Sequence, residues 1–444
     1  MNLQDRIYIL DGATGTALQQ FRLTEADFRG EEFARHPIPL KGNNDVLNIT
    51  RPDVIRQVHQ NYIDAGADII ETNTFNANAI SQTEYGCTEW VERFNLEGAR
   101  LAKEVASACK EREIYVAGSI GPTDKSLTLA PDPDQPTYRI VNFDTLANAY
   151  AGQVAALIEG GVDLLLVETI YDGLNAKAAL YAIAKVQEEK GTNLPVMLSA
   201  TVNDKSGRTL TGQSLEALFT SLSHYPILSF GLNCSFGAKE LHHFLRELAP
   251  RIPCYISIYP NAGLPNEMGE YDESPEFTAL CLQNMAKEGL INIAGGCCGT
   301  TPEHIHKTKL ACDDIPVCEI TDKNRTVISS YSHAVTFGGR PILIGERINP
   351  TGKPKFKQAL KDKDLTYILS MGVAQQESRA DVLDVNVGLP GIDEPQMMVD
   401  VVKELQGVLD LPLQIDTSDP VAMERALRIY NGKPLINSVN GKKE

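Results

Sequence analysis

The chain has 444 residues, which is enough for two or three domains, and 43% of them are hydrophobic, as in ordinary globular proteins. Its formal net charge of -17 argues against a nucleic-acid partner, because nucleic-acid binding starts from a basic surface. No apolar run reaches the roughly 18 residues that span a bilayer, and the first residues lack the order of a signal peptide. We therefore expect a cytoplasmic protein that contacts neither membrane nor nucleic acid.

The nine cysteines are an odd number spread through a long chain, which does not resemble a disulfide framework. In a reducing compartment, cysteines that lie close together are better candidates for metal ligands or nucleophiles.

Residues 1–312 repeat one pattern, in which a short apolar run ends in a polar motif and an amphipathic helical stretch follows. Continuous apolar strands that alternate with helices indicate a parallel sheet covered on both faces. Eight such units predict an α/β chain with a (β/α)8 TIM barrel, and the even spacing disfavours a doubly wound open sheet. The predicted strands are residues 7–11, 67–74, 114–121, 162–169, 195–202, 227–234, 254–261 and 291–298, and predicted helices include 52–65, 91–110, 144–160 and 176–190.

The pattern stops after about residue 312, and we place a linker at residues 313–340. A second series of strands follows, at residues 342–349, 381–388, 411–417 and 434–440. We expect residues 341–444 to form the first half of a second (β/α)8 barrel, a truncated domain with an open apolar edge. The first barrel should fold without this half barrel, whereas the half barrel should be unstable alone, and its ligand affinity should be weak or absent.

Three cysteines follow predicted strands of the first barrel. Cys234 ends the sixth strand, and Cys297 and Cys298 end the eighth. Neighbouring residues of a regular strand point to opposite faces, so joining Cys297 and Cys298 at one metal needs irregular backbone, which the surrounding glycines permit. Three thiolates with an open fourth position suit a catalytic Zn2+, which would deprotonate a substrate thiol. The pattern therefore indicates alkyl transfer to a thiol.

The other cysteines have a simpler interpretation. A lone cysteine is more often a small buried side chain than a ligand. We apply that interpretation to Cys87, Cys109, Cys254, Cys281, Cys312 and Cys318.

The motifs at the strand ends resemble the homocysteine S-methyltransferase family over about residues 5–312. These motifs are Asp11-Gly12-Ala13-Thr14-Gly15-Thr16, Glu71-Thr72-Asn73-Thr74-Phe75, Val167-Glu168-Thr169, Gly231-Leu232-Asn233-Cys234 and Gly295-Gly296-Cys297-Cys298-Gly299-Thr300. The resemblance implies that Cys234, Cys297 and Cys298 bind the catalytic zinc. It also implies that Asn261, in Pro260-Asn261-Ala262-Gly263, is the fourth ligand when substrate is absent.

The resemblance further implies that Asp11 and Glu168 hold the ammonium group of homocysteine. Backbone N–H groups of the loop that starts at Gly12 would then meet the substrate carboxylate. The alternative is that Asp11 caps the following helix and that Glu168 pairs locally.

The second series of strands resembles the pterin-binding methyltransferase family over residues 341–444. Buried Asp and Asn side chains at strand ends can bind the amide edge of a pterin, and the alternative is that they cap the next helices. The resemblance implies that methyltetrahydrofolate contacts Glu346, Asn349, Asn386, Asp416 and Asn437.

The pairing of these two domains resembles the cobalamin-dependent methionine synthases. In that family, methyl passes from methyltetrahydrofolate to cobalamin and then to homocysteine. The sequence contains no Asp-x-His-x-x-Gly motif, so we expect a separate domain or protein to carry methylcobalamin. The alternatives are a cobalamin-independent homocysteine S-methyltransferase, or a zinc-binding protein that performs no methyl transfer.

Overall fold

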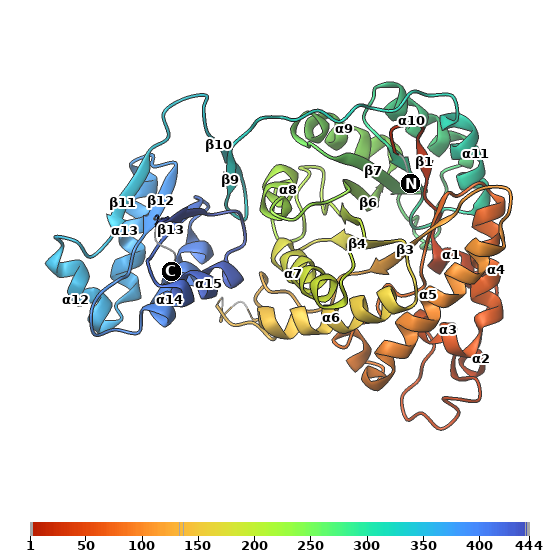
Figure 1. The fold of residues 1–444 in the computed structure, drawn as a ribbon, viewed down its shortest axis with the longest axis horizontal. Coiled ribbons are helices and arrows are strands. Elements are labelled where there is room, and N and C mark those ends of the chain that lie inside the picture. The colour runs from red at the N-terminus through yellow and green to blue at the C-terminus, as the bar shows by residue number, and fades with distance from the viewer. Residues whose placement is uncertain (1–2, 133, 136, 440, 442–444) are drawn as a thin grey trace.

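The computed structural model describes residues 3–132, 134–135, 137–439 and 441, and these form two sheets with their helices (Figure 1). Among these residues, the larger sheet has eight parallel strands in the order β1-β8-β7-β6-β5-β4-β3-β2. Its two edges meet, because Leu10 pairs with Ile69 and the Asp11 N–H donates to the Ile69 carbonyl at 3.0 Å. The sheet is thus a (β/α)8 TIM barrel, as predicted. Its strands are β1 (Tyr8–Ile9), β2 (Ile69–Glu71), β3 (Tyr115–Ile120), β4 (Leu164–Ile170), β5 (Val196–Ala200), β6 (Ser229–Gly237), β7 (Tyr255–Asn261) and β8 (Ile293–Ala294).

Helices cover the outside of this barrel, and some of them begin at a residue whose side chain caps the first turn. The Asn142 side chain accepts from the Thr145 N–H at the start of α6, and Asp172 accepts from the Leu174 N–H at the start of α7. In the described part of the chain, no helix is long and apolar enough to cross a membrane. The helices are α1 (Thr14–Gln19), α2 (Glu25–Arg29), α3 (Leu47–Thr50), α4 (Pro52–Asp64), α5 (Val91–Ala108), α6 (Phe143–Glu159), α7 (Gly173–Lys190), α8 (Leu215–Leu222), α9 (Ala238–Leu248), α10 (Pro275–Lys287) and α11 (Pro302–Cys312), with short 3-10 turns η1 (Asn44–Val46), η2 (Ser81–Thr83), η3 (Thr88–Trp90) and η4 (Ala249–Arg251).

Side chains along each strand alternate between the barrel interior and the helical layer. On β4, Leu164 and Leu166 belong to the apolar cluster inside the barrel, and Leu165 and Val167 pack in the outer cluster. Glu168 continues the inward series and is buried at the carboxyl end of the strand. Inside the barrel, polar side chains therefore lie at the carboxyl ends of the strands, next to an apolar cluster deeper in the interior.

The second sheet lies beside the first barrel (Figure 1, blue). In the described residues it has four parallel strands in the order β11-β12-β13-β14, which form part of a second barrel. Helices cover its outer face, and Leu383, Val385 and Ile415 belong to the core between sheet and helices. Its elements are β11 (Ile344–Ile348), α12 (Pro354–Asp362), α13 (Leu365–Glu377), β12 (Val382–Val385), α14 (Glu394–Val408), β13 (Leu413–Asp416), α15 (Pro420–Ile429) and β14 (Leu435–Asn437). Asn440, at the end of the predicted fourth strand, lies outside the described residues.

A hairpin lies between the two sheets, where the sequence pattern predicted no element. Strands β9 (Val327–Ser329) and β10 (Ala334–Thr336) pair antiparallel, and Ser329 also pairs with Lys433. The Tyr430 hydroxyl donates to the Ser329 carbonyl at 2.9 Å, and the Ser329 hydroxyl donates to the Ala217 carbonyl at 3.3 Å. The hairpin thus depends on contacts from both sides, which its short polar sequence does not reveal.

The turn between α15 and β14 docks on the first barrel. The Lys177 ammonium donates to the Tyr430 carbonyl at 2.9 Å. Asn431 accepts from Gln213 at 3.1 Å and donates to Thr128 at 2.9 Å, so one side chain joins two loops of the barrel to the second sheet.

Candidate active site

The structure brings the three predicted cysteines together at the carboxyl ends of β6 and β8. Their sulfur atoms all lie within 4.8 Å of one another, and the Cys234 and Cys298 sulfurs are 3.7 Å apart. Cys234 and Ser235 have φ values of +60° and +61°, which are uncommon for residues with side chains. The register of β6 against β7 shifts at this point, so the strand bends and turns the Cys234 thiol inward.

The backbone around Cys297 and Cys298 is irregular, and this corrects the predicted strand over residues 291–298. Strand β8 ends at Ala294, after which the Cys297 N–H donates to the Pro260 carbonyl at 2.7 Å. Gly299 has φ of +79°, and a Cβ there would lie 2.3 Å from the Tyr271 side chain. The loop can therefore present both thiols to one point only with glycine at this position.

The pKa values of the three thiols are shifted in different directions. Hydrogen bonds from Cys234 and Cys297 lower the pKa of Cys298, and hydrogen bonding to Cys234 and Cys298 raises the pKa of Cys297. Cys298 is therefore the thiol of this group that loses its proton most easily, and further sulfur donors surround it. Asn261, at the end of β7, is buried, and its Oδ1 has no hydrogen-bond partner among the described residues. This donor set fits Zn2+, which prefers sulfur ligands and four-coordinate geometry.

Three carboxyl groups lie on the same rim. Asp11 and Glu168 are buried, and Glu71, at the end of β2, is partly buried with its Oε1 enclosed. Asp11 accepts from the Glu71 N–H at 3.0 Å, and Glu168 is hydrogen-bonded to the Ser119 hydroxyl. Within the described residues, none of the three carboxyls has an ion-pair partner.

The pKa values of all three carboxyls are raised, because burial disfavours their ionised forms and no positive charge in the described part of the chain stabilises them. Burial raises the pKa of Glu168 to about 7 and that of Asp11 well above its usual range. Burial and the charges of Glu168 and Asp11 raise the pKa of Glu71 as well. A cation bound between these groups would stabilise their ionised forms, so the rim can bind an ammonium group.

The capping alternative for Asp11 does not agree with the geometry. Helix α1 begins after Ala13 without a side-chain cap, so Asp11 does not cap it. A Cβ on Gly12 would lie 2.8 Å from the Tyr62 ring, so this turn requires glycine. The Ala13 N–H already donates to the Thr300 hydroxyl at 3.3 Å. A substrate carboxylate would therefore have to bind the other N–H groups of this turn.

The sequence analysis gave no role to Glu71, Ser119 or Asn233, which also face the barrel interior. Glu71 lies two residues beyond Ile69, which is in the inner cluster, so alternation along β2 was an available signal. Asn233 is fully buried, and its Nδ2 donates to the Cys297 sulfur at 3.9 Å. No sequence pattern reveals that contact, because it depends on closure of the barrel.

The predicted residues of the second sheet are brought together in part. Asn386 donates to Asp416 at 2.9 Å, and Asp416 is aligned with Asn437 on β14. The Asn349 side chain accepts from the Thr351 N–H in a local turn and also interacts with Asp384, next to this group. By contrast, Glu346 is exposed with its Oε2 3.4 Å from Lys353 Nζ. Helix α15 is capped by Asp419, so capping does not explain Asp416. Asp384 and Gln414, which lie side by side below this group, were not predicted.

Comparison with known proteins agrees with these two parts. Residues 8–312 match the family Homocysteine S-methyltransferase, and residues 345–444 match the family Pterin binding enzyme. The chain belongs to the homocysteine S-methyltransferase family. It is therefore a methyltransferase with a pterin-binding domain.

Solved structures share the fold of this methyltransferase barrel. The oxidized form of the homocysteine methyltransferase MmuM from Escherichia coli is 23% identical, with 68% of this chain and 95% of that chain covered and a TM-score of 0.54. Its metallated form is also 23% identical, with 69% and 96% covered and a TM-score of 0.51. At this identity the likeness shows the fold alone.

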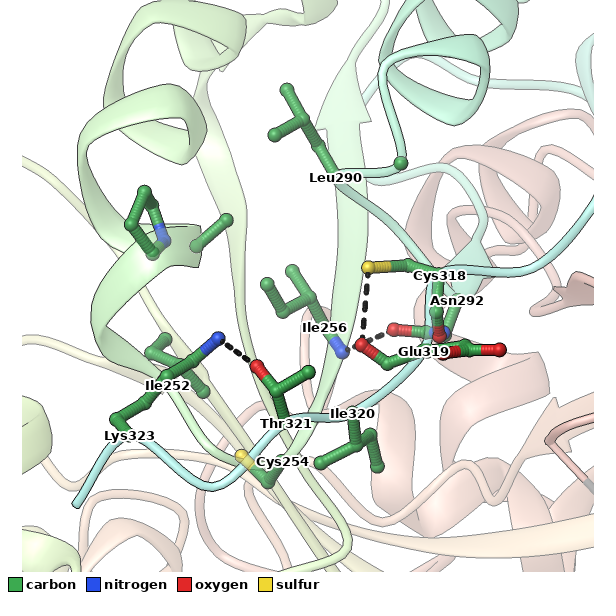
Figure 2. A pocket seen from close by; sticks show the side chains of 13 residues that line it. Ile252, Cys254, Ile256, Leu290, Asn292, Cys318, Glu319, Ile320, Thr321 and Lys323 are labelled. Atoms are coloured by element: carbon green, nitrogen blue, oxygen red, sulfur yellow. Dashed lines mark hydrogen bonds between the residues drawn. The ribbon is translucent and has the colours of Figure 1, made fainter.

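A hollow lies at the amino-terminal ends of β7 and β8 of the methyltransferase barrel (Figure 2). Its volume is about 220 Å3, and the segment around Cys318 and Ile320 passes over the amino-terminal ends of β7 and β8. Burial raises the pKa of Cys254 in this hollow to about 12, so its thiol is protonated at neutral pH.

Proposed function

We propose that this chain activates the thiol of homocysteine for methyl transfer from methylcobalamin to give methionine, as cobalamin-dependent methionine synthases do. Residues 1–312 would form the homocysteine-binding zinc barrel, 313–340 the linker and 341–444 part of a methyltetrahydrofolate-binding domain. The observation that carries the proposal is one rim where three sulfurs converge beside two buried carboxyls and one partly buried carboxyl, none of which has an ion-pair partner among the described residues. An amino thiol has the two groups that such a rim would bind.

The thiol end of the substrate would lie at the cysteines. Cys234, Cys297 and Cys298 would hold the zinc through their sulfurs, and the unpaired Oδ1 of Asn261 makes it the candidate fourth ligand without substrate. Zinc bound there would supply Lewis acidity that keeps a substrate thiol deprotonated at neutral pH. Cys297 and Cys298 are partly exposed, so a methyl donor could approach this rim.

The amino end would lie at the carboxyls. Glu168 and Asp11 would accept hydrogen bonds from the substrate ammonium, with Glu71 close by to share the charge. Arrival of this cation lowers the pKa of each carboxyl and so ionises the site. The turn at Gly12 would face the substrate carboxylate with backbone N–H groups.

The second domain would bind the folate methyl donor. Asp416, Asn386 and Asn437 lie on neighbouring strands and together offer carboxylate and amide groups to a pterin edge. Asn349 and Glu346 would lie farther out on the rim of β11. Methylcobalamin would come from a separate cobalamin-binding domain or protein.

The test is to offer the purified, zinc-loaded chain homocysteine with either free methylcobalamin or S-methylmethionine. If methionine forms with methylcobalamin but not with S-methylmethionine, the proposal is supported. If methionine forms with S-methylmethionine, the chain is a cobalamin-independent methyltransferase. The variant with Cys234, Cys297 and Cys298 all replaced by Ala should lose both zinc and transfer. Tightly bound zinc without transfer from either donor would contradict the proposal and leave a zinc-binding protein.

A further inference from the structure

Asn233 links the two ends of the candidate substrate site. It lies on β6 and is fully buried, with its side chain inside the barrel. Its Oδ1 accepts from the Ser199 hydroxyl at 2.7 Å and from the Thr169 N–H at 3.1 Å. Its Nδ2 donates to the Thr169 hydroxyl at 2.9 Å and to the Cys297 sulfur at 3.9 Å. All the hydrogen-bonding capacity of the amide is used.

One end of this link holds Thr169 in a strained conformation. Thr169 has φ of +55°, which is rare for a β-branched residue. Asn233 binds both its N–H and its hydroxyl, and the register of β4 against β5 shifts between Val167 and Ile170. Because Glu168 directly precedes Thr169, this clamp also sets the direction of the Glu168 carboxyl.

The other end of the link touches the sulfur site. Cys297 follows β8 in the irregular loop, whereas Thr169 lies near the end of β4 on the far side of the barrel. A single amide therefore joins Thr169, which directly follows the carboxyl that would take the ammonium, to a sulfur that would take the metal. The spacing between these two groups is a property of Asn233 and its partners.

We propose that Asn233 is a positioning residue that sets this spacing and thereby selects an amino thiol with the chain length of homocysteine. The inference rests on the proposed function, because it needs an ammonium at Glu168 and a thiol at the cysteines. Cysteine is one methylene shorter than homocysteine and cannot satisfy both ends at a fixed spacing. A difference of one methylene is worth roughly 10-fold to 200-fold in a well-matched site.

The test measures the dissociation constants of homocysteine and cysteine for the zinc-loaded full chain by titration calorimetry. Asn233→Ala should keep about one zinc per chain but lower the ratio of the cysteine constant to the homocysteine constant by about ten-fold or more. Asn95→Ala is the matched control, because Asn95 is equally buried but donates only to the Ala77 and Val91 carbonyls. The control loses stability and should keep the ratio of the wild-type chain.

A rescue variant separates positioning from general damage. Glycine adopts positive φ without a clamp, so Asn233→Ala combined with Thr169→Gly should regain much of the selectivity. Asn233→Asp, which is nearly the same size, provides the test if Asn233→Ala does not fold. It cannot donate to Cys297, and it should also lower the ratio.

Each result decides a different claim. An unchanged ratio in Asn233→Ala or Asn233→Asp, or an equal fall in Asn95→Ala, would overturn the inference. Failure of the wild-type chain to bind homocysteine at all would instead contradict the proposed function.

Discussion

The first barrel and the second sheet use the same repeating unit, but their inner faces meet different surroundings. In the first barrel, β1 pairs with both β8 and the start of β2, so side chains from opposite strands face each other. Asn233 on β6 thus reaches Thr169 on β4 and Cys297 beyond β8. In the second sheet, the described contacts of the predicted residues join neighbouring strands, as between Asn386 and Asp416. Closure of a sheet is what turns alternating polar residues into a three-dimensional site.

The closed barrel should tolerate added volume much less than the open sheet. A Cβ at Gly231 would lie 1.9 Å from the Ser257 carbonyl oxygen on the adjacent strand, and backbone inside a closed barrel cannot yield. Gly231→Ala should therefore cost more than about 4 kcal/mol of unfolding free energy or prevent folding. This would be measured by urea unfolding of the full chain.

The matched variant is Gly345→Ala in the second sheet. There the added Cβ would lie 2.5 Å from Oε1 of Gln375, a side-chain atom that can shift by giving up the hydrogen bond it accepts from the Arg347 N–H. We expect a loss of about 1–2 kcal/mol. Equal losses for the two variants would break the comparison between closed and open sheets.

Much of the fold and of the cysteine rim was predictable from the alternation and spacing of residues in the sequence. The predicted helix at 52–65 is α4 (Pro52–Asp64), because Pro52 suits a first helical turn and the apolar residues recur at helical spacing. Parallel strands end on one face, so the sequence also placed Cys234, Cys297 and Glu168 on a common rim.

Long-range contacts account for what the sequence did not reveal. Strands β1 and β8 span only two residues each, because the chain leaves the ladder to build the rim. The positive φ of Thr169 is set by Asn233, which is 64 residues away. The hairpin of β9 and β10 is stabilised by residues of two sheets, so no local pattern marks it.

The buried rim should make the metal-free barrel less stable at higher pH. Burial raises the pKa of Glu168 from 4.5 to about 7. The native chain therefore binds more protons than the unfolded chain between these pH values, and stability falls as pH rises through this window. Glu168→Gln cannot ionise and should be more stable than the wild-type chain at pH 8 by up to about 3 kcal/mol. Near pH 4.5 the two should be alike.

Denaturant unfolding of the metal-free proteins at the two pH values would measure this difference. Zinc and homocysteine should then reverse the order at pH 8, because the ammonium stabilises the ionised carboxyl. A stability difference that is the same at both pH values would mean that Glu168 acts only through packing.

The smallest expected effect concerns the docking of the two parts. Lys177→Met keeps the aliphatic length but removes the hydrogen bonds to the Tyr430 and Gly432 carbonyls. We expect docking to weaken by about 1–2 kcal/mol, seen as faster hydrogen exchange at residues 430–433. Lys185→Met on the exposed face of α7 is the control and should change nothing.

Docking should also depend on pH. Burial lowers the pKa of Lys177 from 10.5 to about 7, so the released state binds more protons between these values and docking strengthens as pH rises. Lys177→Met should lose this dependence. A pH dependence that persists in the variant would assign it to another group.

The central claim is that the three cysteines hold a metal with an open position for the substrate thiol. X-ray absorption at the zinc edge of the loaded full chain tests it most directly. The account predicts three sulfur ligands at about 2.3 Å and a fourth after homocysteine is added. A sulfur count that homocysteine leaves unchanged, or zinc retained when Cys234, Cys297 and Cys298 are all replaced by Ala, would contradict it.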